Sequence, residues 1–529
     1  MRNLELPGRS PVHATGGMAA TSHPLSTAAA LDMLKNGGNA MDAAITACAV
    51  QCVVEPQSTG IGGDCFVLYA PGGSADILAY NGSGRAPAKA TADWFADQGI
   101  SEIGVHSPHS VTVPGAVDAW CRLLEDHGTK SLDQVLGYAI DYARDGFPVH
   151  DRVASDWKRC ETMLGQDESA RRIYLPDGHA PEAGHLHKQP ELARTLKTIA
   201  AEGRDGFYRG SVAEDIASHL KSLGGAHEIG DFADAAGEYV TPVKTSYRGY
   251  EVHECPPNGQ GIIALLMLNI LADMGLDKLD PLSPERLHLF IEAGRLAYAE
   301  RNALISDPDQ VDVPVDMLLS AEHAAELRGR IDPSKATAGL PPEAIPHSDT
   351  VYLTVVDKDR NAVSFINSLF QSFGSGLVGP KSGVILQNRG YSFNLDPAHP
   401  NCIAPNKRPM HTIIPGMLTK GDRAVMPFGV MGGHYQSFGH AYFLTNLFEH
   451  DLDLQEAMDL PRLFPAVDGP VEVESGMPDD VVKALQGMGH KTAAPAKPIG
   501  GAQAIWIDWQ QGVLTGGSEP RKDGLALGY

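Results

Sequence analysis

The sequence is short of cysteine, of positive charge and of long apolar runs, and each shortage excludes a class of protein. Its 529 residues include seven cysteines and no CxxC pair, so a disulfide scaffold is not expected and thiols in a reducing compartment fit better. Lysine and arginine total 42 against 65 aspartates and glutamates, which leaves a net charge of -23. This balance argues against a nucleic-acid partner, which needs a basic surface, and against adsorption to an anionic membrane.

A targeting or membrane segment is also missing. Residues 1–17 carry Arg2, Glu5 and Arg9 and lack the apolar core that is typical of a signal peptide. The longest weakly polar run, residues 43–54, is too short to span a bilayer. We therefore expect no membrane attachment and a cytoplasmic location.

Several common catalytic signatures are absent. The chain has no G-x-S-x-G elbow, no H-E-x-x-H pair and no Walker loop, which leaves a serine hydrolase of another fold without its motif. Residues 155–158 match S-x-x-K but lack the companion motifs of that class, so we regard the match as chance. The 21 histidines show no metal-ligand spacing along the chain, and neither a metal nor an organic cofactor is expected.

What is present first is a pair of helices near the N-terminus. Residues 22–35 have apolar positions at helical spacing and are followed by two glycines, which end the helix. Asn39 then predicts the cap of a second helix over residues 40–54, with Asp42 at the third position of a capping box. This second helix is apolar on nearly all sides, so it should be buried.

Later segments alternate between strands and helices. A glycine-rich turn over residues 57–64 leads into a strand over residues 65–69. A buried helix is predicted over residues 262–274, and a longer amphipathic helix over residues 283–302.

A sharp change of pattern occurs at Thr350. Residues 332–349 are rich in Pro, Ala, Gly and Ser without firm periodicity, which predicts a linker. Residues 351–357 are rich in β-branched side chains, residues 358–361 form a turn, and residues 362–370 form a second strand. A hairpin therefore begins directly after Thr350.

Several stretches spread over nearly the whole chain are distinctive in combination. They are MAATSHPLSTAAALDMLKNGGNAMDAA from Met18, VVEPQSTGIGGDCFVLY from Val53, DTVYLTVVDKDRNAVSF from Asp349, KRPMHTIIPGM from Lys407, GVMGGHYQ from Gly429 and GGSEPRKDG from Gly516. In this order they resemble the γ-glutamyltransferase (glutathione hydrolase) family of N-terminal-nucleophile (Ntn) hydrolases. The resemblance implies an α+β fold with four layers, αββα, and the activity of an amidohydrolase or acyltransferase.

The resemblance also implies a precursor that is cut between Asp349 and Thr350. Residues 1–349 would form a large chain and residues 350–529 a small chain, and both would share one intertwined domain. The cleavage site is therefore not a domain border. The two chains would stay associated, and a homodimer of the pair stays open.

The chemistry of threonine supports the same position. Once freed, Thr350 carries an α-amine with an ordinary pKa of about 7.7–8.0, which can accept the hydroxyl proton near neutral pH. The head of a buried strand would hold this hydroxyl rigidly. By resemblance, Ser368 takes the place of a second hydroxyl residue that bonds the nucleophile. Gly432 and Gly433 match the glycine pair whose backbone N–H groups frame the oxyanion.

The substrate-binding positions depart from the family. The arginine that holds the substrate carboxylate is replaced by Ser83, with Arg85 two positions later. An aspartate that holds the α-amino group becomes Ser392, and Arg389 replaces the glutamine beside an asparagine. At the other pocket positions, Phe370 replaces an asparagine of the family, and His411 and Thr412 replace a pair of serines. Asn388 is an asparagine that the chain shares with the family.

These departures change the chemistry of the expected pocket. Without the aspartate and with Arg389, an α-amino cation is disfavoured, whereas a carboxylate is favoured because arginine binds it with two N–H groups. In this respect the chain is similar to the oxamate amidohydrolase branch. Our hypothesis is that Arg85 or Arg389 binds the carboxylate of a small amide substrate. True glutathione hydrolase or transpeptidase activity is the alternative within the family, and an inactive, unprocessed binding homologue is the alternative outside catalysis.

Overall fold

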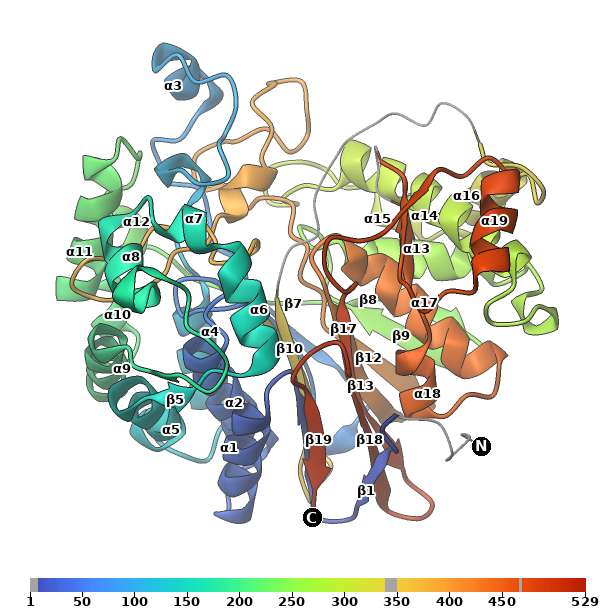
Figure 1. The fold of residues 1–529 in the computed structure, drawn as a ribbon, viewed down its shortest axis with the longest axis horizontal. Coiled ribbons are helices and arrows are strands. Elements are labelled where there is room, and N and C mark those ends of the chain that lie inside the picture. The colour runs from blue at the N-terminus through green and yellow to red at the C-terminus, as the bar shows by residue number, and fades with distance from the viewer. Residues whose placement is uncertain (1–7, 338–349, 466–468) are drawn as a thin grey trace.

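Two seven-stranded antiparallel sheets face each other at the centre of the molecule, and helices cover the outer face of each sheet (Figure 1). The structure is a computed structural model that describes residues 8–337, 350–465 and 469–529. In this arrangement the four layers run helix, sheet, sheet, helix, so the expected αββα fold is confirmed.

The first sheet contains the strand that begins after Thr350. Its strands lie in the order β19 (Leu525–Gly528), β2 (Met18–Thr21), β10 (Val351–Val356), β11 (Ala362–Ser368), β3 (Asp64–Ala70), β4 (Leu78–Gly82) and β7 (Glu238–Val240). The helices on its outer side include α1 (Pro24–Lys35), α2 (Ala40–Val54), α4 (Ala116–His127), α5 (Leu132–Asp145), α9 (Pro190–Glu202) and α11 (Gly210–Ser222).

The second sheet carries the glycine pair at the end of one strand. Its order is β1 (Val12–Ala14), β18 (Val513–Ser518), β17 (Gly501–Asp508), β13 (Arg423–Met431), β12 (Gly416–Lys420), β9 (Tyr250–Glu254) and β8 (Val243–Tyr247). Its outer helices include α13 (Gly261–Leu271), α14 (Pro284–Leu304), α16 (Ala321–Gly329), α17 (Tyr435–Glu449), α18 (Leu454–Asp459) and α19 (Asp479–Gly487).

Strand β10 shows why the central strands are apolar on both faces. Leu353 and Val355 pack into the core between the first sheet and its helices, whereas Tyr352 and Val356 pack into the core between the two sheets. Side chains of a strand alternate between faces, so a strand covered on both sides must be apolar throughout. The same double burial holds the strand that follows Thr350 in one position.

The predicted local elements are largely confirmed. Helix α2 has the expected capping box, in which the Asn39 side chain accepts from the helix backbone and the Asp42 carboxylate accepts from Asn39. The hairpin after Thr350 pairs Val351 with Asn367. Its second strand ends at Ser368, two residues before the prediction, because Phe370 has a φ of 80°, outside the strand region.

The helix predicted over residues 283–302 is present as α14, but it is not amphipathic. Helix α14 is buried on nearly all sides, and its polar residues Arg286, His288, Glu292 and Arg301 are at most 1% exposed. Helices α13, α17 and α19 pack around it, and neighbouring segments supply hydrogen-bond partners for those polar groups, such as Asn446 for Arg286. Charged residues in the sequence suggested an exposed face, but tertiary partners allow them to be buried.

All seven cysteines are free thiols. Within the described ranges, no helix combines the length and the apolar character needed to cross a bilayer.

Candidate functional site

Thr350 lies at the head of β10 and faces the end of β11, where Ser368 is located. The two hydroxyl oxygens are 3.0 Å apart, and both side chains are fully buried. The backbone N–H of Phe370 donates to Ser368 Oγ at 2.9 Å, which fixes this oxygen beside Thr350. The hairpin register therefore brings together the two hydroxyl residues that the sequence places eighteen positions apart.

Arg389 is the buried cation of this site. It begins a short 3-10 helix, η5 (Arg389–Ser392), and its Nη2 lies 3.4 Å from Ser368 Oγ. Its Nη1 donates to Thr412 Oγ1 at 2.8 Å, and its Cζ lies 4.0 Å from the centre of the Phe370 ring. Burial lowers the pKa of the Arg389 guanidinium to about 9, although the nearby Asp64 raises it. Among the described residues no carboxylate forms an ion pair with Arg389, and its buried Nε has no hydrogen-bond partner, so the guanidinium suits a bound anion.

His411 and Asp64 form a second buried pair beside Arg389. His411 Nε2 lies 2.9 Å from Asp64 Oδ2, and the backbone N–H of Ile413 donates to His411 Nδ1 at 3.3 Å. Since Nδ1 accepts, Nε2 carries the proton and donates to Asp64. Burial lowers the pKa of His411 to about 4, helped by the positive charge of Arg389 and opposed by Asp64. We conclude that His411 is a neutral hydrogen-bond donor that orients Asp64.

The depressed pKa of His411 makes the stability of the fold sensitive to acid. An unfolded chain would bind a proton at this histidine below pH 6.5, whereas the folded chain binds it only near pH 4. The contribution of neutral His411 to the free energy of unfolding is therefore complete above pH 6.5. It is lost as the pH falls towards 4, and the loss amounts to about 3 kcal/mol. Urea unfolding at several pH values should show a shallower acid decline for His411→Gln than for the native chain. Equal slopes for the two proteins would contradict this assignment.

Gly432 and Gly433 form the turn between β13 and α17. Their φ angles are 130° and 58°, a region that side chains other than glycine rarely adopt. A Cβ on Gly432 would lie 2.9 Å from the Cα of Gly500, so the turn also has no room for one. Gln260 Nε2 donates at 2.9 Å to the carbonyl oxygens of both Gly433 and Thr412. Gln260 thus connects the glycine turn with the segment that contacts Arg389.

Two of the expected substrate-binding residues have other partners. Arg85 lies apart from the cluster around Thr350: its guanidinium pairs with Asp309 at 2.9 Å and Asp307 at 3.5 Å, and donates to the carbonyl of Asn406. Asn388 Oδ1 accepts from the backbone N–H of Gln371 at 3.1 Å, and its Nδ2 donates to Val105. Asn388 therefore holds the loop that carries Phe370, and the surroundings of Arg85 are already acidic. Asp349, the other side of the expected cleavage site, lies outside the described residues.

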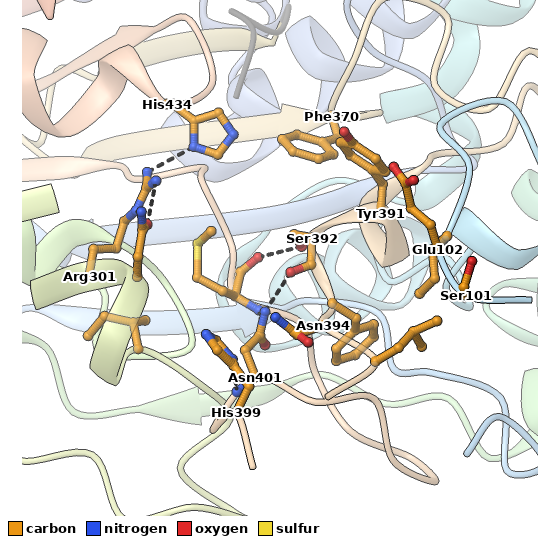
Figure 2. A pocket seen from close by; sticks show the side chains of 16 residues that line it. Ser101, Glu102, Arg301, Phe370, Tyr391, Ser392, Asn394, His399, Asn401 and His434 are labelled. Carbon is orange, nitrogen blue, oxygen red and sulfur yellow. Dashed lines mark hydrogen bonds between the residues drawn. The ribbon is translucent and has the colours of Figure 1, made fainter. Parts of the chain in front are cut away.

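A cavity of about 310 Å³ adjoins this cluster. The rings of Phe370 and His434 meet edge to face in its wall, with centres 5.8 Å apart, and His434 directly follows the glycine pair. Figure 2 shows the Arg301 guanidinium next to His434, whose Nδ1 it approaches to 2.8 Å. The lining comprises Ser101, Glu102, Ile103, Arg301, Asn302, Ile305, Phe370, Tyr391, Ser392, Phe393, Asn394, Leu395, His399, Asn401, Met410 and His434.

The sequence did not single out Asp64, Arg301 or His434. Asp64 and His434 lie within stretches that carry the family resemblance, and Asp64 follows the glycine-rich turn as the first residue of β3. Their contacts with His411, Gln260 and the glycine turn arise only in the folded chain, so no local pattern marks them as functional.

Comparison with known proteins places this geometry in a family. The Gamma-glutamyltranspeptidase family matches residues 26–529. The chain is 37% identical to the glutathione hydrolase-like YwrD proenzyme of Bacillus subtilis, over 97% of this chain and 98% of that protein. It is 34% identical to the oxamate amidohydrolase proenzyme of Klebsiella pneumoniae, over 97% of this chain and 99% of that protein. The structure of a cephalosporin acylase from Bacillus halodurans is similar with a TM-score of 0.93 and 39% identity, over 100% of this chain and 99% of that one.

Proposed function

The chain belongs to the γ-glutamyltranspeptidase family of Ntn hydrolases, and on that premise we propose that it is a self-processing amidohydrolase with Thr350 as its nucleophile. The observation that carries the proposal is the contact between Thr350 Oγ1 and Ser368 Oγ at the head of a buried strand. Relatives named as proenzymes support processing into residues 1–349 and residues 350–529. The two chains would remain one domain, because strands from both share each central sheet.

In the proposed reaction, the freed amine of Thr350 accepts the proton of its own hydroxyl, directly or through a water molecule. Oγ1 attacks the amide carbon, an ester bond forms to Thr350, and the C–N bond breaks as the leaving nitrogen takes up the proton. Water then cleaves the ester, which releases the acid and restores the hydroxyl. An amine in place of water would give acyl transfer.

The oxyanion of each step is assigned to the backbone N–H groups of Gly432 and Gly433. Their turn stands at the N-terminal end of α17, where the helix dipole favours negative charge. Hydrogen bonds that are already oriented towards a developing charge lower the barrier by several kcal/mol. Ser368 would bind Oγ1 of the nucleophile throughout, since its own oxygen is held by the Phe370 backbone.

The proposed substrate is a small amide that bears a carboxylate, with Arg389 as its anchor. Arg389 is fully buried, touches Ser368 and lacks a carboxylate partner among the described residues. A cationic α-amino group beside this guanidinium would be repelled, which favours an oxamate-like substrate over a γ-glutamyl compound. Thr412 would orient the guanidinium, and His411 would occupy Asp64 as a hydrogen-bond donor. Glutathione hydrolase activity remains the alternative that the family supports.

A substrate comparison tests this proposal. Ammonia release from oxamate should proceed with a kcat/KM at least about tenfold higher than p-nitroaniline release from γ-glutamyl-p-nitroanilide, which corresponds to about 1.4 kcal/mol of discrimination. The reverse ratio would assign the chain to the glutathione hydrolases. No turnover of any amide, together with a single uncut polypeptide on a denaturing gel, would instead identify an inactive binding homologue.

A further inference from the structure

Three buried side chains far from Thr350 converge on one point. His288 and Glu292 lie one turn apart on α14, and His490 follows the end of α19. Figure 1 shows α19 beside α14 on the outer side of the second sheet. One ligand atom from each side chain lies within 4.8 Å of the others, and all three residues are at most 3% exposed. Nothing in the proposed reaction uses this cluster.

The hydrogen bonds define where the protons of the two histidines lie. His288 Nε2 is 2.7 Å from the carbonyl oxygen of Asp332, which can only accept, so Nε2 carries a proton. His288 Nδ1 therefore presents a lone pair, and it lies 2.7 Å from His490 Nε2. In this arrangement a single proton on His490 Nε2 joins the two rings.

We propose that His288, Glu292 and His490 form a binding site for a divalent transition metal, with Zn²⁺ as the best fit. Two imidazole nitrogens and one carboxylate oxygen are a ligand set that zinc accepts, with water in the fourth position. The metal would take the place of the proton between the rings, and that proton would move to His490 Nδ1. No redox step is involved.

The surroundings resemble the outer shell of a metal site. His288 donates its single N–H, on Nε2, to a backbone carbonyl, an arrangement that orients a ligating imidazole and fixes its tautomer. Glu292 Oε2 accepts from the backbone N–H of Thr337 at 2.9 Å, which holds the carboxylate towards the histidines. These contacts exist before any ion enters, so His288 and Glu292 are already oriented. The two ring nitrogens, now 2.7 Å apart, would have to separate to roughly 3.3 Å to bind one tetrahedral zinc.

Arg295 is the group that competes with the metal. Its Nη1 lies 3.2 Å from Glu292 Oε1 and 3.3 Å from His490 Nδ1. A metal-bound His490 would carry a proton on Nδ1, so the guanidinium would have to withdraw from it. Because 19% of the Arg295 side chain is exposed, it has a path towards solvent. Removal of Arg295 should therefore strengthen metal binding.

The position of the site suggests a structural role. Arg301, which lines the cavity, lies roughly 14 Å along α14 from Glu292. The metal would therefore be too far away to reach the reacting atoms. If the chain is cleaved as the proposed function requires, the ion would link the two resulting chains; only this statement rests on the proposed function. His288 and Glu292 belong to residues 1–349, and His490 belongs to residues 350–529. Residues 332–337, which contact both Glu292 and His288, would be held in the same place.

Zinc binding to the full chain tests the proposal. After treatment with EDTA and buffer exchange, the native protein should bind about one Zn²⁺ in calorimetry and by metal analysis, and its Tm should rise by about 2 °C when zinc is at about a hundred times Kd. His490→Ala and Glu292→Gln should weaken binding by about 100-fold or more, whereas Arg295→Gln should tighten it.

The matched control is His323→Gln. His323 Nε2 also faces a glutamate of α14, Glu300, at 3.6 Å, but it is not part of the cluster. This variant should bind zinc like the native chain. Absence of zinc binding by the native protein, or equal binding by native and Glu292→Gln proteins with matching circular dichroism, would overturn the site. Zinc content measured on uncleaved Thr350→Ala protein separates this result from the fate of the proposed reaction, because the cluster needs no cleavage.

Discussion

Replacing Thr350 by alanine should abolish both turnover and cleavage of the chain. The variant keeps the strand but has no oxygen to form the ester and, because it stays uncut, no free α-amine at residue 350, so kcat/KM should fall by on the order of 10⁴-fold or more. On a denaturing gel the native protein should give a larger and a smaller band, with the smaller one starting at TVYLT, whereas Thr350→Ala should stay whole. Amide hydrolysis and gel analysis of the same preparations measure both effects.

The control for this experiment is Thr350→Ser. Serine keeps the hydroxyl and its 3.0 Å contact with Ser368 but loses the methyl group that restricts rotation, so some of each activity should persist. A fully active alanine variant would remove Thr350 from the mechanism. An active native preparation without a TVYLT fragment would do the same.

Replacing Arg389 by methionine should remove the preference for carboxylate-bearing amides. A buried guanidinium that binds a carboxylate through two N–H groups contributes about 3–4 kcal/mol, so kcat/KM for oxamate should fall by on the order of 10²- to 10³-fold. An uncharged amide of similar size should lose far less, although the contact of Arg389 with Ser368 will cost it some rate. The measurement is the kcat/KM for oxamate divided by the kcat/KM for the uncharged amide. This oxamate ratio isolates the effect of the charge.

Arg85→Gln is the matched control for that prediction. Arg85 is the other arginine that the sequence offers, but its charge is already balanced by Asp307 and Asp309. The oxamate ratio should therefore stay within about twofold of the native value. A loss of oxamate hydrolysis in Arg85→Gln, with Arg389→Met unaffected, would reverse the assignment. Stability should not confuse the result, because methionine removes a buried cation and fills much of its volume.

The elements around Thr350 could be predicted because they depend on residues that are neighbours in the sequence. The apolar helix after Asn39 and the β-branched hairpin after Thr350 are specified by local caps, turns and side-chain patterns. Helix α14 was predicted within two residues of its ends, but its burial was not, because its polar groups depend on partners supplied by α17 and His490, which no local pattern reveals. The His288 cluster was invisible for the same reason, since His490 is remote in sequence.

By itself, then, the sequence determined the family and, through that resemblance, the layers of the fold, and it proposed Thr350 and Ser368 as a pair of hydroxyl residues, because the order of the motifs can be read along the chain. Only the tertiary structure distinguishes the two arginines and favours Arg389 as the proposed carboxylate anchor. It surrounds Arg85 with carboxylates and buries Arg389 beside Ser368 and Thr412. The difference lies in desolvation and in the neighbours that folding brings to each charge. For Arg85 these come from 224 residues away and for Arg389 from 21 and 23 residues away, distances that no local pattern covers.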